Sequence, residues 1–236
     1  MYYGFDWTYL VLVLPCVLLS MWASSSVNST FKKYSSHHSS RRITGAEAAQ
    51  RVLSWNGVTG VRIERVKGKL TDHFDPTTNV IRLSDSVHNS TSVAAIGVAC
   101  HEAGHAVQYA KHYAPIKLRA AIIPITNIGS KLAMPLILLG LLLSFLGNIS
   151  TGIVYLGIAC FALSLVFPLV TLPVEFNASR RAMNAIADSG ILTAEEQKGA
   201  QKTLKAAAMT YVAATAVSLA QLLRLLVLFG GRRRND

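Results

Sequence analysis

Long apolar runs dominate the hydrophobic pattern of this chain, separated by amphipathic and polar stretches. The runs are residues 8–23, 131–147, 152–172 and 206–229. A helix needs about 20 apolar residues to cross the roughly 30 Å hydrocarbon core of a bilayer. The first run is short, and the second must be extended by residues 122–128. We therefore expect about four transmembrane helices, the second and third of which form a hairpin.

Between the first two spans the pattern becomes that of a small folded core. Thr44 and Glu47 have capping-box spacing, and they open an amphipathic helix that Gly57 ends. Three β-like segments follow, at 61–66, 69–74 and 79–84. They predict a short antiparallel sheet. The segment 79–84 could be the edge that receives an extended substrate, or it could be only part of a structural hairpin.

A further helix is predicted from Ser92 to Ala110, with a broad apolar surface. The polar residues His101, Glu102 and His105 interrupt this surface, so we expect them to be partly buried. The fold class is accordingly mainly α and integral to the membrane, with a small α+β core. The predicted segments are an N-terminal anchor (1–23), a Ser-rich mobile connector (24–40), the folded core (41–120), the transmembrane hairpin (121–172), a second helical and polar segment (173–205) and a last span with a basic tail (206–236).

Composition and charge support a membrane location. The chain is 51% hydrophobic and only 15% charged, and its formal net charge is +11. Basic residues follow the first span and lie between the third and fourth, whereas the loop 147–152 has none. The positive-inside rule then places the N-terminus outside and the basic segments in the cytoplasm. This pattern accounts for most of the charge without nucleic acid, and we expect no nucleic-acid partner.

Two terminal features bear on this topology. Residues 1–10 contain no Lys or Arg, which favours a retained anchor over a cleaved signal peptide. Arg232, Arg233 and Arg234 would lie outside if the last span crosses fully, against the positive-inside bias. Arg224, near the end of that span, is expected to extend its charge toward the interface.

The motif His101-Glu102-Ala103-Gly104-His105 indicates zinc chemistry. Two histidines four residues apart lie on one helix face, and a catalytic zinc usually takes three protein ligands and leaves one position for water. Glu175 is the first acid after the transmembrane hairpin returns the chain to the same side, and we predict it as the third ligand. Glu102 is predicted as the general base. We expect one Zn²⁺ per chain.

Other polar residues are candidates for supporting roles. His73, His88, and Arg180 or Arg181 are alternative donors that could stabilise the transition state. Asn177 and Ser179 could hydrogen-bond a zinc-binding histidine.

The chain also resembles a known family, the bacterial YugP-type membrane zinc metallopeptidases. The segments that carry the resemblance are Asn56–Val58, Leu70–Pro76, Arg82–Ser84, Ser92–Ala95, His101–Gln108 and Leu172–Ala182. The last is similar to the glutamate-ligand helix of gluzincins, which implies Glu175 as a ligand and a mini-gluzincin-like core. The chain departs from the family pattern at Asn177, where an acid is expected, and at Ser179, where related membrane proteases carry Asp.

These observations favour a multi-pass membrane zinc endopeptidase that cuts membrane or misfolded proteins near the cytoplasmic face. Its partners would be a polypeptide substrate and the lipid bilayer, and the pattern identifies neither an oligomer nor a partner protein. The alternative is a zinc-stabilised membrane scaffold or regulator without catalysis. Glu102 discriminates the two, because a purely structural zinc site has no use for a general base.

Overall fold

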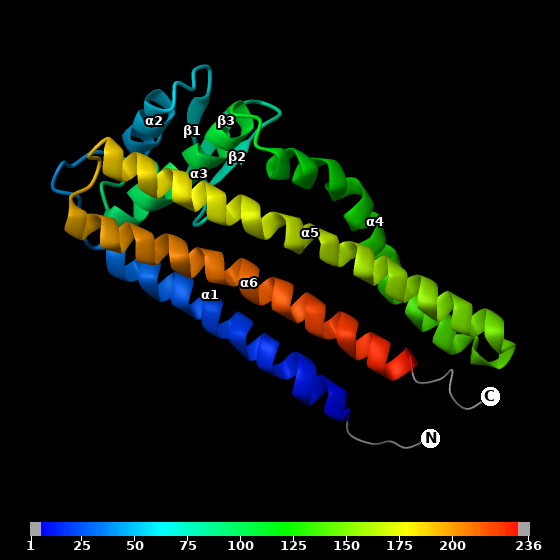
Figure 1. Ribbon diagram of the computed structural model, residues 1–236. Helices are drawn as coiled ribbons and strands as arrows, with labels where there is room; N and C mark the ends of the chain where they lie inside the picture. Colours follow the sequence, from blue (N-terminus) through cyan, green and yellow to red (C-terminus); the bar gives the residue numbers. More distant parts are fainter. Residues whose placement is uncertain (1–5, 231–236) are drawn as a thin grey trace. The chain divides into compact units, whose positions relative to one another are not determined.

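The computed structural model describes residues 6–230, which form long helices and one small three-stranded sheet (Figure 1). The basic tail discussed above lies outside the described residues. The chain divides into two compact units. We call the unit made of residues up to Trp22, Leu118–Leu172 and the residues from Tyr211 onward the helical unit. The mixed unit consists of Ala23–Lys117 and Pro173–Thr210.

Four helices in the described part of the chain are long and apolar enough to cross a membrane, which confirms the predicted number of spans. They are α1 (Leu14–Ser35, preceded by a π-helical turn at Tyr9–Val13), α4 (Ala114–Leu142), α5 (Asn148–Asp188) and α6 (Ala194–Gly230). Each of these helices contributes residues to both units.

Glycines bring α4 and α5 close together in the helical unit. A Cβ atom on Gly140 would lie 2.9 Å from the Ser150 carbonyl oxygen, and one on Gly157 would lie 2.9 Å from the Ala133 carbonyl oxygen. The Ser150 hydroxyl also donates to the Gly140 carbonyl at 2.9 Å. The predicted hairpin is therefore held by close backbone contact, as is usual where apolar helices pack without a hydrophobic driving force.

Arg224, near the end of α6, pairs with Asp6. Its Nε donates to Asp6 Oδ2 at 3.0 Å, and its Nη2 makes a second bond to the same oxygen. The Arg224 guanidinium also lies 5.6 Å from the centre of the Tyr9 ring. The end of α6 is thus tied to the beginning of the first span within the helical unit.

Two predicted interruptions are absent from the described helices. Residues 24–35, expected to be a mobile connector, continue α1, because apolar Phe31 packs against the core of the mixed unit. The segment 173–205 was expected to be separate from the transmembrane hairpin, but α5 runs unbroken through Pro173. A proline removes one helical hydrogen bond. Burial of Val174 and Ala178 on α5 compensates for that loss.

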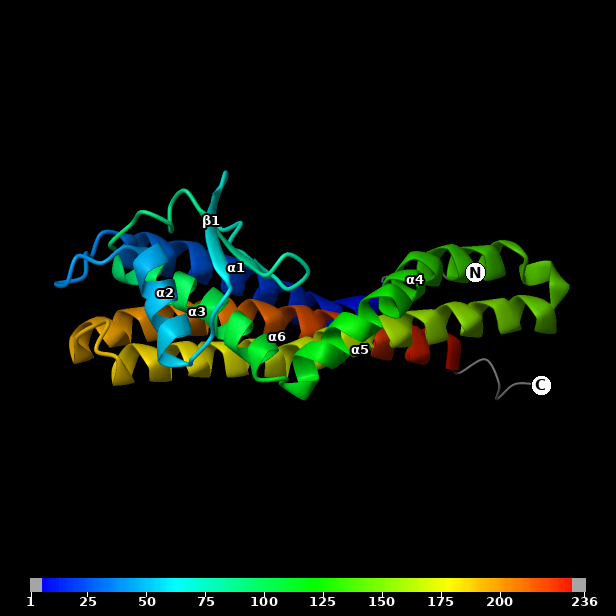
Figure 2. The ribbon, with the colours of Figure 1, turned by 90° about the horizontal axis from the view of Figure 1, so that it is seen from above.

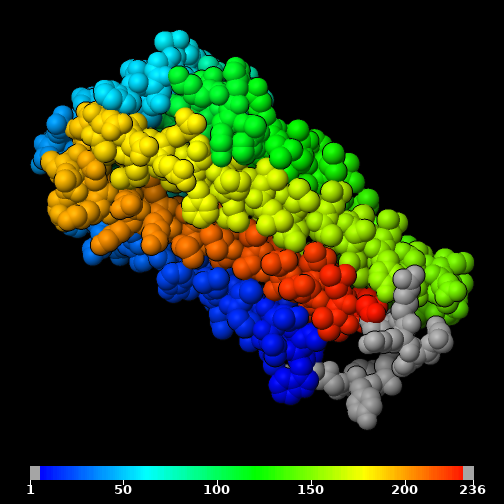
Figure 3. Space-filling view, viewed as in Figure 1, coloured from blue at the N-terminus to red at the C-terminus, as the bar shows by residue number. Residues whose placement is uncertain are grey.

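The mixed unit contains α2 (Gly45–Trp55) and α3 (Val93–Ala110), and both begin as predicted. Thr44 Oγ1 accepts from the Glu47 backbone N–H at 3.2 Å, and Glu47 Oε2 accepts from the Thr44 backbone N–H at 2.6 Å. Ser92 caps α3 by accepting from the Ala95 backbone N–H. Both helices pack into one core with residues of α5 and α6. Figure 3 shows those parts of α5 and α6, in yellow and orange, side by side.

The sheet is mixed, and the prediction of an antiparallel sheet was wrong. Its strands are β1 (Arg62–Val66), β2 (His73–Asp75) and β3 (Val80–Ser84), in the order β1-β3-β2. β2 and β3 form an antiparallel hairpin, whereas β1 pairs with β3 in parallel. The expected edge strand, β3, is therefore central, and its apolar residues Val80, Ile81 and Leu83 are fully buried. The edges are β1 and β2.

A close approach between α3 and α5 depends on Gly104. A Cβ atom at this position would lie 2.6 Å from the Ala178 carbonyl oxygen. We expect Gly104→Ala to lower the free energy of unfolding by about 1–3 kcal/mol, the usual cost of overpacking. Gly152→Ala in α5 is the matched control, since a Cβ atom on Gly152 would have no neighbouring atom within 4 Å. Thermal unfolding in detergent tests this, and equal midpoints for the two variants would contradict it.

The β2–β3 turn should make stability depend on pH. The hydroxyls of Thr77 and Thr78 and the guanidinium of Arg82 donate to Asp75 and hold the pKa of its carboxyl well below the usual range. A depressed folded-state pKa stabilises the fold above the unfolded value of about 3.9, and that contribution is lost as pH falls further. Asp75→Asn should therefore lower the unfolding midpoint at pH 7 by more than it does below about pH 4. A difference that widens in acid would count against this account.

Candidate metal centre

Helix α3 places two histidines on one face, one turn apart. The centroids of the His101 and His105 rings are 4.7 Å apart, with the rings almost perpendicular. His105 is buried, and His101 is partly exposed. The arrangement follows from the helical spacing of the motif on a helix with an otherwise apolar, buried surface.

Glu175 of α5 reaches both imidazoles. Its Oε2 atom lies 3.2 Å from His101 Nε2 and 3.5 Å from His105 Nε2. The residue is only 2% exposed. Val174 and Ala178 are fully buried on the same helix, so α5 cannot turn this face to solvent without uncovering them.

The three side chains offer a donor set that fits zinc. One ligand atom from each of His101, His105 and Glu175 lies within 4.8 Å of the others. Zinc binds nitrogen and oxygen at about 2.0–2.1 Å in a tetrahedral arrangement, which separates neighbouring ligand atoms by roughly 3.4 Å. The two distances to the Glu175 oxygen bracket that value. Two imidazoles and one carboxylate also leave a fourth position open.

Glu102 lies between the two histidines in the sequence and is 8% exposed. It does not belong to the group of converging donors found among the described residues. Its carboxylate is close enough to His105 to favour the protonated imidazole electrostatically. Glu102 is thus a buried acid beside the donor set.

The environment of His105 favours its charged form in the absence of a metal. Burial opposes protonation, but the hydrogen bond to Glu175 and the charges of Glu102 and Glu175 outweigh it. The pKa of His105 is therefore raised above its ordinary value. A cation at this position is electrostatically favourable, which is also what a metal ion would supply.

Each imidazole has a polar neighbour at its other nitrogen. Ser179 Oγ lies 3.1 Å from His101 Nδ1, and Gln108 Oε1 lies 3.0 Å from His105 Nδ1. Gln108 is fully buried and was not considered from the sequence. A signal was available, because an uncharged polar residue three positions after His105 falls on the same apolar helix face.

The remaining predicted residues lie at different distances from the donors. Asn177 Oδ1 accepts from Gln108 Nε2 at 3.0 Å, so Asn177 reaches His105 only through Gln108. His73, on β2, is exposed, and its Nδ1 lies 2.8 Å from the Thr71 carbonyl. Arg180 is exposed on α5. The structure therefore links His101, His105, Glu175 and Ser179 directly, and Asn177 through Gln108, with Glu102 buried beside them. The described contacts do not connect His73 or Arg180 to this group.

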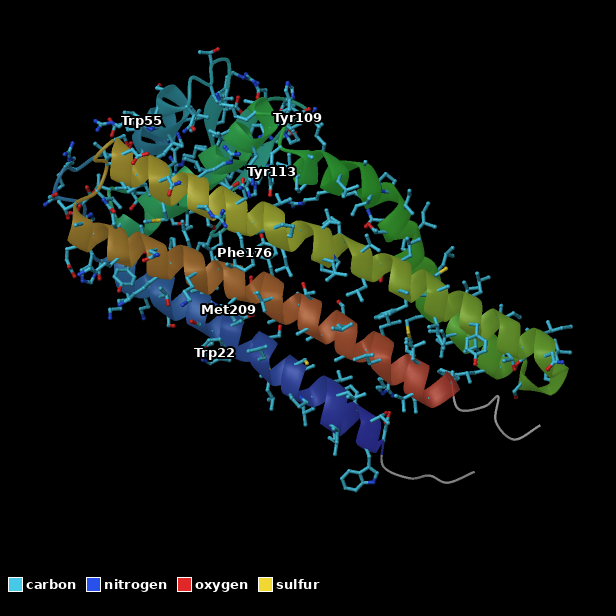
Figure 4. The ribbon with its side chains drawn as sticks, viewed as in Figure 1. Trp22, Trp55, Tyr109, Tyr113, Phe176 and Met209 are labelled. Atoms are coloured by element: carbon cyan, nitrogen blue, oxygen red, sulfur yellow. The ribbon has the colours of Figure 1, made fainter. Side chains whose placement is uncertain are left out.

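The edge strand β2 lies beside the motif helix. Phe74 of β2 meets Tyr109 of α3 with ring centroids 6.1 Å apart in an edge-to-face arrangement. Tyr109 follows His105 by four residues, which is about one turn of α3. Figure 4 labels Tyr109 near the end of this helix, and Figure 2 shows α3 and β1 from a second direction. The edge strand β2 is thus attached to the helix that carries the donors.

Comparison with known proteins gives a consistent result. Residues 9–230 match the family described as "Putative neutral zinc metallopeptidase". The chain is also 46% identical over 228 residues to "Putative membrane protease YugP" of Bacillus subtilis (strain 168), and the match covers 96% of this chain and 99% of the relative. No solved structure matches the chain. With nearly its whole length matched, this chain belongs to the neutral zinc metallopeptidase family.

Proposed function

We propose that the protein is a membrane-embedded zinc-dependent endopeptidase. The observation that carries the proposal is the convergence of His101, His105 and Glu175 from two helices, with the buried acid Glu102 beside them. Buried imidazoles and a buried carboxylate are costly unless they are paired, and a zinc ion would pair with all three at once. The name of the relative supports a membrane protease in the same sense.

His101, His105 and Glu175 would hold one Zn²⁺ per chain, which when bound lowers the pKa of a water toward about 7 and polarises a peptide carbonyl. Glu102 accepts the proton that this water loses as its oxygen bonds to the carbonyl carbon. Glu102 then delivers that proton to the amide nitrogen as the carbon–nitrogen bond breaks. The products are a carboxylic acid and an amine, so the step consumes one water and regenerates the Glu102 carboxylate.

The edge strand β2 is the element best placed to align a polypeptide. No strand among the described residues pairs with its outer side, and Phe74 and Tyr109 attach it to α3. An extended substrate can add to such an edge through main-chain hydrogen bonds. We therefore assign substrate binding to β2 and not to the segment 79–84, because that segment forms the central strand β3.

The substrates we propose are membrane or misfolded proteins, cut near the cytoplasmic face. Basic residues lie at the end of α1 and just after it (Lys32, Lys33, Arg41 and Arg42), and on the last part of α5 and the first part of α6 (Arg180, Arg181, Lys198, Lys202 and Lys205). This distribution favours a cytoplasmic location for both stretches. Glu175 precedes the second of these clusters on α5. The N-terminus would then lie outside the cell membrane.

Zinc content tests the ligand assignment. We expect about one zinc per chain in the detergent-purified protein after dialysis, and a sharp loss in Glu175→Ala, because a site with two remaining ligands binds zinc weakly. Elemental analysis measures both. Zinc retained by Glu175→Ala would remove Glu175 from the site, and a folded wild type without zinc would contradict the zinc-dependent endopeptidase.

Glu102→Gln tests catalysis separately from metal binding. Glutamine has nearly the shape of glutamate but cannot accept the proton, so cleavage should fall by at least about 10²-fold while zinc content and the unfolding midpoint are retained. Cleavage of a denatured membrane protein in detergent, followed by gel analysis, gives the rate. Undiminished cleavage by this variant would rule out Glu102 as the base, and no cleavage by the zinc-loaded wild type would favour the scaffold.

A further inference from the structure

Four polar side chains form a continuous hydrogen-bonded series that begins at Arg181 of α5 and ends at His105 of α3. Arg181 Nε donates to Asn177 Oδ1 at 2.8 Å, and Gln108 Nε2 donates to the same oxygen at 3.0 Å. Gln108 Oε1 lies 3.0 Å from His105 Nδ1. All four residues belong to the mixed unit, and α3 and α5 contribute two each.

The direction of each bond follows from the chemistry of the end members. An arginine guanidinium only donates, so the Asn177 atom that faces it is the amide oxygen. A backbone carbonyl only accepts, and Gln108 Nε2 also lies 2.8 Å from the Val174 carbonyl. Two acceptors on different groups therefore hold the Gln108 amide in one orientation, with Nε2 toward α5.

This orientation leaves Gln108 Oε1 facing His105. An amide oxygen accepts, so His105 Nδ1 must carry a hydrogen. The neutral imidazole then presents a lone pair at Nε2, the nitrogen that lies 3.5 Å from the Glu175 carboxylate oxygen. A flipped Gln108 amide would set its NH₂ group against Nδ1–H and its oxygen against two acceptors.

We propose that Arg181, Asn177 and Gln108 form a relay of positioning residues that selects the metal-binding tautomer of His105. The inference rests on the proposed function, because the tautomer matters only if a metal binds at Nε2. Burial supports a dedicated role: Gln108 is 0% exposed, and a buried amide without partners is costly. Its partners are supplied by α5, the helix that also carries Glu175.

The tautomer of His101 is not fixed in this way. Ser179 is the neighbour of His101 Nδ1, and a hydroxyl rotates to donate or to accept. The relay is also anchored at its far end, where the Arg181 guanidinium lies 5.8 Å from the centre of the Tyr113 ring. The Tyr113 backbone N–H donates to the Gln108 carbonyl at 2.9 Å, and Figure 4 labels Tyr113 just beyond α3.

Zinc affinity of the purified full chain, measured by chelator competition, tests the relay. Gln108→Met has nearly the size of glutamine without its polar atoms, and we expect about 10- to 100-fold weaker zinc binding, as for other partners of metal-binding histidines. Arg181→Met and Asn177→Leu should weaken binding by smaller factors, because Gln108 keeps its bond to the Val174 carbonyl.

A conservative variant separates this role from a merely structural one. Asn177→Asp keeps an oxygen for both donors, so it should bind zinc within a few-fold of the wild type. The visible spectrum of the Co²⁺-loaded protein should change in Gln108→Met and not in Asn177→Asp. The unfolding midpoint of each metal-free variant shows that the affinities refer to folded protein.

Arg180→Met is the matched control, since it removes the same charge from the neighbouring, exposed position of α5. It should leave zinc affinity unchanged. Unchanged affinity in a folded Gln108→Met, or equal losses in Arg180→Met and Arg181→Met, would overturn the relay, even if Glu175→Ala loses zinc as proposed. If Gln108→Met does not fold, the zinc affinities of Asn177→Leu and Asn177→Asp are compared instead. Weaker binding by Asn177→Leu alone supports the relay, and equal affinities overturn it. A folded wild type that binds no zinc overturns both the relay and the proposed function.

Discussion

The contact between α3 and α5 at Gly104 is the constraint on which the rest of the site depends. Without a side chain at that position the two backbones approach closely, and the Ala178 carbonyl occupies the space that a Cβ atom would need. This approach brings Glu175 within 3.5 Å of both histidines. The donor set is therefore a product of helix packing, and a few tenths of an ångström in that packing decide whether the three ligand atoms can share one ion.

Close packing at this contact also buries polar groups that require partners. Glu175 and Gln108 have almost no exposed surface, and each is satisfied by groups on the facing helix. Such networks contribute little net stability, but breaking them is costly. The same bonds that join α3 to α5 thus orient the imidazoles, so the fold and the proposed metal site are stabilised by shared interactions.

Sequence patterns predicted correctly those elements that are determined by neighbouring residues in the chain. The capping box of α2, the apolar stripe of α3 and the number of long apolar helices depend on residues close together in the chain, and all three agree with the structure. The strand order was missed because β1 pairs in parallel with β3 and not with β2, the next strand along the chain. The continuity of α5 through Pro173 was missed because burial outweighs the local proline penalty.

The sequence by itself determined the membrane-spanning helices, and a helical motif that places two imidazoles one turn apart with a carboxylate between them in the chain. Spacing suffices for that, because helical geometry is the same in every chain. Only the tertiary structure decided how Glu175 meets the motif, which strand lies at the edge, and which side chains hold each imidazole. Gln108 illustrates the difference, since its role comes from the direction of hydrogen bonds to α5, and bonds between distant segments leave no periodic trace in a sequence.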